Sequence, residues 1–280
     1  LKADGLAAGK GVFVCETHQE LFDRSQDLFE KRVLGSAGSR ALLEQFQSGW
    51  ELSYFVLTNG REFQSLPVAQ DHKRLLDDGK GPNTGGMGAV APYKVSSSLQ
   101  TQIDERVIRP TIHGLSQSQL MYRGILFVGL MVTPDGVQVL EYNVRFGDPE
   151  AQVLLPLLDG DWSEVFAEVA QGQVPRLNWN SLYSASVVLA AKGYPDNPVK
   201  GQKIQGDVFT QSSTRYFLHA GVKRSENDEY LTNGGRVLNA IGLADSQEGA
   251  IRAAYEQAFL VQWPGLQIRR DIGASSPGKA

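Results

Sequence analysis

The chain has 280 residues, 41% hydrophobic and 21% charged, which is typical of a globular protein with one or two domains. Its net charge of −4 argues against a nucleic-acid partner held by bulk electrostatics. Cys15 is the only cysteine, so no internal disulfide can form and a reducing, cytoplasmic compartment is expected. The longest strongly apolar run, 124–132, is too short to cross a bilayer, so we expect no membrane partner.

The two ends of the sequence also carry information. Residues 1–4 read as the middle of a strand and do not begin with Met, so we expect the chain to be a piece of something longer. Residues 274–280 are small and polar, which predicts a flexible tail.

A loop rich in glycine and alanine, residues 5–11, lies between two short strand-like pieces. Its backbone N–H groups can approach a phosphate closely, and Lys2 and Lys10 can supply positive charge. The spacing excludes a P-loop, because Gly5 and Gly9 are separated by three residues and Gly11 follows the lysine. A plain hairpin turn is the alternative interpretation.

A helix is predicted next, because Thr17 and Glu20 have the spacing of a capping box. Residues 41–58 then read as a strand, a short break and a second strand, with Glu44 before the break and Glu51 after it. Such a linker can serve as a hinge whose backbone binds a base while an acid binds ribose hydroxyls. Two solvated glutamates beside a turn are the alternative.

Residues 71–74, Asp-His-Lys-Arg, precede the glycine-rich stretch 81–88, Gly-Pro-Asn-Thr-Gly-Gly-Met-Gly. A cationic cluster followed by such a loop is a candidate second anion site. For 71–74 alone, a solvated charge run is the simpler explanation. The loop is harder to explain in that way, because three glycines in four residues cost backbone entropy.

A helix is predicted over 96–115, and Pro110 is expected to kink or end it. A hairpin over 124–145 and a short helix over 162–171 follow. Beyond a linker at 175–180, strands at 184–191, 215–220 and 236–241 and a helix that starts at Asp245 or Ser246 indicate a small α/β domain.

The stretch LEYNVRFGDPE, residues 140–150, carries the most chemistry. Glu141 and Asn143 are two apart on a strand, so their side chains leave the same face and offer oxygen ligands to Mg²⁺. The turn at 147–149 gathers Arg145, Asp148 and Glu150 near that metal. An amphipathic strand end with surface charges explains this stretch alone equally well.

The chain resembles the phosphoribosylamine–glycine ligase (glycinamide ribonucleotide synthetase) family, an ATP-grasp group of purine biosynthesis. The resemblance covers residues 1 to about 273 and is carried, in the family's order, by LKADGLAAGKGV, LEQF, GWELS, QDHKR, GPNTGGMGA, LEYNVRFGDPE and TNGGRVL. It implies a mixed α+β and α/β chain: an ATP-grasp fold with an incomplete small lobe, followed by a small C-terminal α/β domain. The implied parts are 1–50 (partial small lobe), 51–175 (large lobe), 181–273 (C-terminal domain) and 274–280 (tail).

The resemblance also implies a reaction. Glycine is phosphorylated by ATP, and the acyl phosphate is attacked by the amine of 5-phosphoribosylamine to give glycinamide ribonucleotide. ATP and Mg²⁺ or Mn²⁺ are the implied cofactors, the two small molecules are the substrates, and a monomer is expected. Two alternatives stay open: a related ATP-grasp ligase with another acid and amine, or a truncated nucleotide-binding module without catalysis.

The implied roles fall on positions that match the family motifs. Those for ATP phosphates, adenine and ribose are Lys2, Ala7, Ala8, Gly9, Lys10, Gly11, Val12, Glu44, Gln45, Phe46 and Glu51. Those for the metal and the glycine side are Glu141, Asn143, Arg145, Asp148 and Glu150. Those for the phosphoribosyl substrate are Asp71, Lys73, Gly85, Gly86, Met87, Gly88 and Arg236.

The sequence departs from the family in three places. The family's N-terminal domain and the start of its small lobe have no counterpart here, so this chain alone is expected to be weak or inactive. Gln45 replaces the second acid of the hinge, and Trp50 stands where the family usually has a glutamate. The replacement at Gln45 would leave the backbone contacts to adenine in place. Beside Trp50, the retained Glu51 keeps the ribose role.

Overall fold

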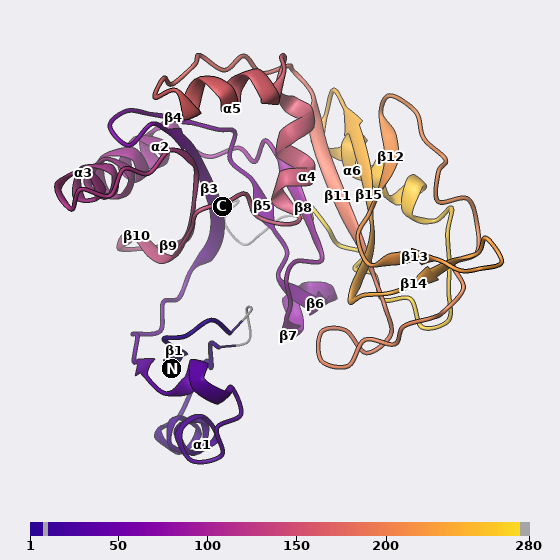
Figure 1. The fold of residues 1–280 in the computed structure, drawn as a ribbon, viewed down its shortest axis with the longest axis horizontal. Helices are drawn as coiled ribbons and strands as arrows, with labels where there is room; N and C mark the ends of the chain where they lie inside the picture. The colour runs from indigo at the N-terminus through magenta and orange to yellow at the C-terminus, as the bar shows by residue number, and fades with distance from the viewer. Residues whose placement is uncertain (8–10, 275–280) are drawn as a thin grey trace. The chain divides into compact units, whose positions relative to one another are not determined.

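The computed structural model describes residues 1–7 and 11–274, which form two compact units, Leu1–Ser48 and Gly49–Ala280 (Figure 1). The predicted roles of Ala8, Gly9 and Lys10, and the tail beyond Ala274, fall outside the described residues. Within the described part of the chain, no helix is long and apolar enough to cross a membrane.

The first unit is built around the predicted loop and helix. Strand β1 (Lys2–Ala3) pairs antiparallel with β2 (Ala41–Leu42), and Lys2 also forms a bridge with Val12, as expected for two strand-like pieces around a loop. Helix α1 (His18–Phe29) begins where predicted, with the Thr17 hydroxyl accepting the Glu20 amide at 3.1 Å. The short 3₁₀ turn η1 (Gly35–Gly38) follows it.

The second unit contains a four-stranded antiparallel sheet in the order β10-β9-β3-β4. Its strands are β3 (Trp50–Thr58), β4 (Phe63–Ser65), β9 (Gly124–Thr133) and β10 (Gly136–Asn143), so the predicted hairpin is confirmed. Alternation along β3 divides the core between two faces. Leu52, Tyr54 and Val56 pack with Ile103 and its helix, whereas Phe55 and Leu57 pack on the opposite side.

The helix predicted over 96–115 does not end at Pro110. Helix α2 (Ser97–Ile103) continues through a π-helical turn, η3 (Asp104–Ile108), into α3 (Arg109–Gln117). In the π turn, the Arg109 amide donates to the carbonyl of Asp104, five residues earlier. The wider turn accommodates the proline, which cannot donate a hydrogen bond and would crowd the carbonyl four residues before it.

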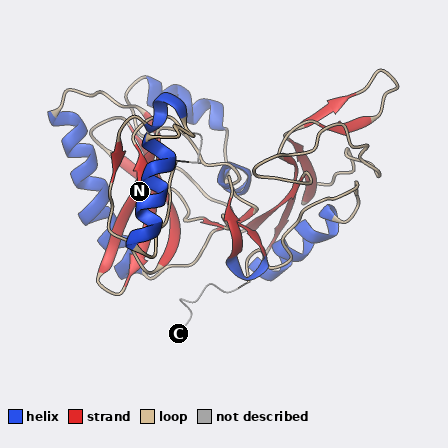
Figure 2. Cartoon of the chain, turned by 90° about the horizontal axis from the view of Figure 1, so that it is seen from below, coloured by secondary structure: helices blue, strands red, loops and turns tan. Residues whose placement is uncertain are grey.

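The second sheet has five strands in the order β12-β15-β11-β8-β5. The strands are β5 (Gln70–Asp71), β8 (Gly88–Ala91), β11 (Tyr183–Ala190), β12 (Arg215–His219) and β15 (Arg236–Ala244). Helix α6 (Gln247–Ala258) lies along one face, and its N-cap is Ser246, one of the two predicted starts (Figures 1 and 2). This sheet joins strands from the predicted ranges 51–175 and 181–273, and those domain boundaries stay a prediction.

Short elements complete the second unit. The hairpin of β13 (Val222–Arg224) and β14 (Tyr230–Thr232) projects away from the five-stranded sheet (Figure 2). The remaining elements are β6 (Arg74–Leu76), the 3₁₀ turn η2 (Asp77–Gly79), β7 (Lys80–Asn83), α4 (Glu150–Leu154), the 3₁₀ turn η4 (Leu155–Leu157) and α5 (Trp162–Ala170). Because β5 and β6 flank residues 72–73 and β7 leads into 84–88, these elements carry the predicted anion site.

Candidate active site

The glycine-rich loop meets the turn of the 140–150 motif in the second unit. Gly86 has φ +112°, and a Cβ there would overlap the Pro149 ring and lie 2.8 Å from Asp71 Oδ1. Only glycine combines this backbone conformation with so close an approach. The loop is also tied to the 71–74 segment, because the amide and hydroxyl of Thr84 both donate to the carbonyl of Lys73, at 2.8 and 2.7 Å. Three predicted motifs therefore share one small region.

Arg236, at the start of β15, joins the loop to the same turn. Its Nη1 donates to the Gly85 carbonyl at 2.8 Å and to the Asp148 carbonyl at 2.5 Å. Its Nη2 forms an ion pair with Asp148 Oδ2 at 3.0 Å. The planar fork of an arginine suits such multiple recognition, which a lysine cannot reproduce. Arg236, predicted for the phosphoribosyl substrate, thus lies beside Gly85 and Asp148.

Glu150 points into the interior at the start of α4, where only 3% of the residue is exposed. Ser53, buried in β3, donates its hydroxyl to Glu150 Oε1 at 3.0 Å. Burial raises the pKa of Glu150, since the ionised form loses its hydration. The hydrogen bond from Ser53 opposes that rise but does not cancel it.

Asp71 is the second acid in this region. Burial raises the pKa of Asp71 well above its ordinary range, and the negative charge of Glu150 adds to the rise. Its buried Oδ1 has no hydrogen-bond partner among the described residues. An acid with a raised pKa and an unused oxygen is suited to accept a proton or to bind an amine.

Lys73 supplies a positive charge beside these acids. Its Nζ lies 2.8 Å from Glu51 Oε2. Burial works against the charged ammonium, but the carboxylates of Glu51 and Asp71 prevail and raise the pKa of Lys73. Lys73 therefore stays protonated at neutral pH. Glu51, predicted to bind ribose, is paired with this lysine in the structure.

Glu141 and Asn143 lie side by side at the end of β10. A bulge interrupts the pairing between Val139 and Glu141, and Asn143 Nδ2 donates to Glu141 Oε1 at 3.3 Å. Rotation of the terminal amide of Asn143 by half a turn would bring its oxygen beside the carboxylate of Glu141. The pair therefore fits Mg²⁺, which takes few protein oxygens and keeps water and phosphate as its other ligands.

Other metal arrangements find no support in the part of the chain that the structure describes. Residues 1–7 and 11–274 contain no group of three or more His, Cys, Asp or Glu that could hold a metal ion.

The predicted nucleotide residues of the first unit cluster at its small sheet. Lys2 Nζ lies 3.5 Å from Glu44 Oε1, and the Ala3 amide donates to the Gly11 carbonyl at 2.8 Å. Gly11 also lies so near Ala7 that a Cβ would be 2.7 Å from the alanine methyl group. Gln45 and Phe46 are exposed. The structure thus gathers one end of the predicted phosphate loop beside Glu44.

Two of the predicted residues, Met87 and Gly88, serve the backbone of the loop and present no side chain at the site, whereas the side chain of Arg145 is exposed. Met87 is fully buried, and its backbone groups bond to His72 and Val188, so it belongs to the scaffold of the loop. Gly88 belongs to β8 and packs against the Ser186 carbonyl. Arg145 is exposed and donates to the Phe146 carbonyl at 2.7 Å.

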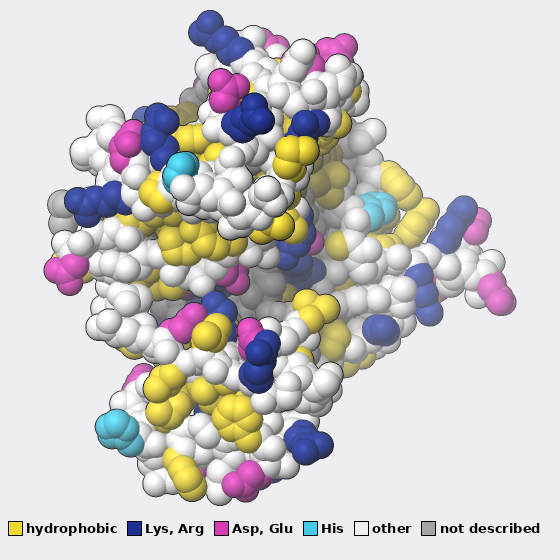
Figure 3. Space-filling view, turned by 60° about the vertical axis from the view of Figure 1, so that its left-hand side comes forward, with side chains coloured by type: hydrophobic (Ala, Val, Ile, Leu, Met, Phe, Trp, Pro, Cys, Tyr) yellow, Lys and Arg dark blue, Asp and Glu magenta, His cyan; other side chains and the backbone are white. Residues whose placement is uncertain are grey.

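Two clefts in the second unit lie apart from this cluster. A polar cleft of about 730 Å³ is lined by Arg61, Glu62, Phe63, Gln64, Ser65, Asp104, Arg109, Ile112, His113 and Ser116. An apolar groove of about 660 Å³ runs along α3 and β10, where exposed apolar side chains such as Met121 and Val144 gather (Figure 3). Neither contains a residue that the sequence assigned to the site.

Sequence reasoning missed two site residues. Ser53 is a buried serine within the apolar run of β3, and a small polar residue buried in such a run is the signal that could have identified it. Tyr194 accepts the Gly85 amide at 2.9 Å through its hydroxyl, and nothing in its local sequence pattern indicates that role.

The fold and this cluster of acids, cations and glycines define an ATP-grasp protein. The same fold, without close sequence similarity, occurs in the biotin carboxylase domain of 2-oxoglutarate carboxylase from Hydrogenobacter thermophilus. That structure shares 15% identity, has a TM-score of 0.69, and the match covers 95% of this chain and 57% of that one.

The sequence comparisons identify the family. Residues 1–151 match the phosphoribosylglycinamide synthetase ATP-grasp (A) domain, and residues 184–275 match the C domain of the same synthetase. The chain belongs to the phosphoribosylglycinamide synthetase family.

Two relatives illustrate the similarity. The phosphoribosylamine–glycine ligase of Halalkalibacterium halodurans is 43% identical over 99% of this chain. The crystal structure of the ligase from Thermotoga maritima is 37% identical with a TM-score of 0.82, and the match covers 97% of this chain and 68% of that one. The chain spans 64% of the length of the Halalkalibacterium relative.

Proposed function

We propose that the protein carries out ATP-dependent ligation of glycine to 5-phosphoribosylamine, giving glycinamide ribonucleotide, ADP and phosphate. The observation that carries this proposal is the meeting of the glycine-rich loop and the 147–150 turn, at Gly86, Asp71 and Pro149. These two motifs set this ligase apart from other ATP-grasp enzymes in the sequence, and they lie together with acids and cations suited to an amine and a phosphate.

The proposed mechanism begins with the binding of ATP and the metal ion. Lys2, Gly11, Val12 and the 44–46 segment contact ATP, and Glu51 releases Lys73 to bind the ribose hydroxyls. Glu141 and Asn143 would hold Mg²⁺, which would supply positive charge to neutralise the phosphates; Mn²⁺ has the same ligand preference. Phosphoryl transfer needs positioning and charge neutralisation more than covalent help from the protein.

Glycine is activated on the Arg145 side of the site. A carboxylate is a poor electrophile, and transfer of the γ-phosphoryl group to one of its oxygens creates a leaving group while ADP departs. Arg145 stabilises the anionic acyl phosphate, and Glu150 and Asp148 orient the ammonium group of glycine.

The phosphoribosylamine binds beside the glycine-rich loop. Its amine attacks the acyl carbon, the C–N bond forms, phosphate leaves with the former carboxylate oxygen, and the amine loses a proton. Asp71 accepts that proton, because its raised pKa and unpartnered oxygen suit a base. Lys73 and Arg236 bind the phosphate of the substrate, in a protein we expect to act as a cytoplasmic monomer.

The test is phosphate release by the protein at its natural length. Release should require ATP, glycine and phosphoribosylamine together, and Arg145→Ala should abolish it. Release with a different acid and amine, and none with these substrates, would favour a related ATP-grasp ligase. Nucleotide binding without turnover under any combination would favour a nucleotide-binding module.

A further inference from the structure

Residues 269–273, here called the C-terminal strap, cross the second unit after α6. Before the strap, Gln267 exchanges two backbone hydrogen bonds with Ala190, at 2.8 and 2.9 Å. Within it, Ile272 is buried in the core, and the Tyr255 hydroxyl of α6 donates to the Arg269 carbonyl and accepts the Ile272 amide. The strap is therefore fixed to the body of the five-stranded sheet.

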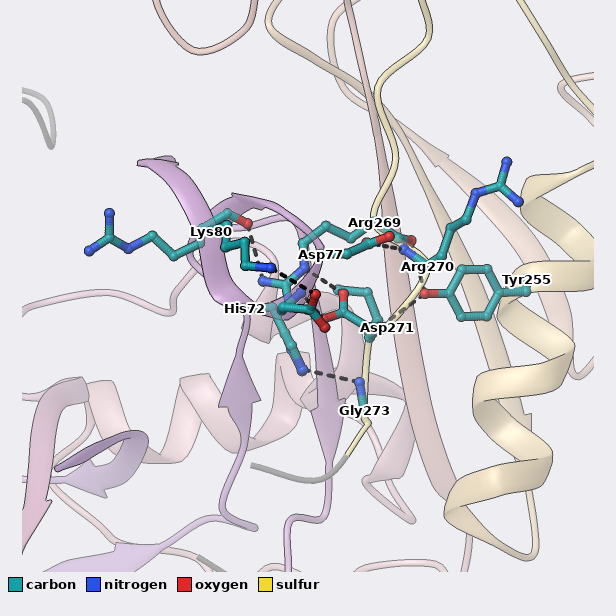
Figure 4. Close-up of polar contacts among 11 residues, drawn as sticks. His72, Asp77, Lys80, Tyr255, Arg269, Arg270, Asp271 and Gly273 are labelled. Atoms are coloured by element: carbon teal, nitrogen blue, oxygen red, sulfur yellow. Dashed lines mark hydrogen bonds and ion pairs between the residues drawn. The ribbon is translucent and has the colours of Figure 1, made fainter. Parts of the chain in front are cut away.

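From this anchored position the strap bonds to the segment 72–78 (Figure 4). Arg269 Nη1 donates to the Arg74 carbonyl at 3.2 Å, and the Gly273 amide donates to His72 Nε2 at 3.1 Å. Two further hydrogen bonds join backbone amides to acids: Arg270 N to Asp77 Oδ1 at 2.7 Å, and Asp78 N to Asp271 Oδ2 at 2.9 Å.

These contacts hold Lys73 on both sides, because His72 precedes it and Arg74 follows it. They also reach the glycine-rich loop. The Met87 amide donates to the His72 carbonyl, and the Thr84 amide donates to the Lys73 carbonyl, each at 2.8 Å. A displacement of residues 72–74 would therefore move both the side chains of that segment and the loop beside them.

The centre of the strap is an ion pair between the buried Arg269 and the half-buried Asp271. Arg269 is 4% exposed, and its Nε and Nη2 lie 2.7 Å from Asp271 Oδ1 and Oδ2. The guanidinium and its hydrogen bonds hold the pKa of Asp271 at about 2, against the opposing effect of burial. Taking the Arg269 guanidinium out of water costs free energy that an ion pair often fails to recover relative to packed apolar residues, so a directional role explains the pair better.

We propose that Arg269 and Asp271 are positioning residues, which fix the backbone of 72–78 so that Asp71 and Lys73 face the phosphoribosylamine. This inference rests on the proposed function, and it adds a device outside the motifs that contact substrate. Neither residue touches substrate; each acts through the segment to which it is bonded.

The experiment replaces the pair with apolar residues, Arg269→Met together with Asp271→Leu, in the protein at its natural length. The KM for phosphoribosylamine should rise about tenfold or more, because small misplacements of binding groups are costly. The KM values for glycine and ATP should stay unchanged. Amide hydrogen exchange should accelerate in peptides covering 72–88 while the unfolding temperature stays close to that of the wild type.

The control removes a different arginine–carboxylate pair of the same unit, Arg215→Gln with Glu256→Gln, whose side chains are both exposed. It should leave all three KM values and the exchange of 72–88 unchanged. If the apolar variant fails to fold, Arg269→Lys serves instead, since it keeps the charge but loses the fork that reaches Arg74.

Two results overturn the proposal. One is an unchanged KM for phosphoribosylamine. The other is an equal rise in the KM values for all three substrates, with an unchanged rate of amide hydrogen exchange in residues 72–88. A wild-type protein without glycine- and phosphoribosylamine-dependent turnover refutes the proposed function instead. In that case, exchange in 72–88 still decides whether the strap positions the segment.

Discussion

Gly86→Ala tests whether the glycine-rich loop and the 147–150 turn form one site. The added Cβ would overlap the Pro149 ring and lie 2.8 Å from Asp71 Oδ1, where ordinary contact begins at 3.4 Å. Asp71 or the loop must therefore shift by about 0.6 Å to relieve this contact alone. The φ of +112° adds backbone strain of about 1–3 kcal/mol for a residue other than glycine.

The matched control is Gly79→Ala in the 3₁₀ turn η2. Gly79 also has a positive φ, +65°, but a Cβ there would meet nothing within 4 Å. This control carries a backbone cost of about 1–2 kcal/mol without the clash.

Both alanine variants should lower the unfolding temperature, but only Gly86→Ala should impair turnover. We expect its kcat/KM for phosphoribosylamine to fall by about 10²-fold, as a misplacement near 1 Å can cause. The assay is initial-rate phosphate release alongside thermal unfolding. A Gly86→Ala protein with the kinetics of the Gly79→Ala control would refute the placement of this loop at the site.

Three further predictions concern the acids and His72. Glu141→Ala and Asn143→Ala should each weaken Mg²⁺-ATP use severely, with an unfolding temperature near that of the wild type; unchanged turnover in both would remove them from the metal site. Ser53→Ala should lower the free energy of unfolding by about 1 kcal/mol and raise the pKa of Glu150 further. The acidic limb of the pH–rate profile should then move to higher pH, and an unmoved limb would contradict this. Burial, with the charge of Arg269, lowers the pKa of His72 to about 4 from an ordinary 6.5. As the pH falls, His72 therefore takes up a proton in the unfolded chain before it does so in the folded one. The free energy of unfolding should keep its full value above pH 6.5 and decrease as the pH falls toward 4. His72→Gln should flatten that part of the stability curve in urea titrations, and an equally steep curve would show that other groups cause the fall.

Much of the local structure was predictable because it depends on short-range chemistry. The Thr17 cap, the hairpin before Glu141 and the start of α6 at Ser246 follow from capping and turn residues within a few positions. The Glu141–Asn143 pair was predictable for the same reason, since strand periodicity alone places both side chains on one face.

Features that depend on distant parts of the chain were not predictable. The pairing of β8 with β11 joins residues about a hundred positions apart, and the sequence of neither strand indicates which strand it pairs with. The end of α1 at Phe29 was not predictable from the capping box at Thr17 either, since that pattern marks only the start of a helix. Tertiary packing decided these points, and local propensity is only a weak guide to it.

The site shows the same division. The acids and glycines near Asp148 and also Arg236 were identifiable from motifs. The pairing of Arg236 with Asp148 and the contact of Ser53 with Glu150 were not, because they join remote strands and turns. The strap was missed altogether, since Arg269 and Asp271 lie in a part of the predicted C-terminal domain (181–273) to which no motif assigns a role.

The most direct test of the proposed chemistry follows oxygen from glycine. Glycine labelled with ¹⁸O in its carboxylate is incubated with ATP, Mg²⁺, phosphoribosylamine and the protein at its natural length. If the carboxylate is phosphorylated and then displaced by the amine, one labelled oxygen should appear in the released phosphate for each glycinamide ribonucleotide formed. Product formation with unlabelled phosphate would contradict the acyl-phosphate route, and labelled glycine recovered unchanged beside intact ATP would contradict the ligase assignment itself.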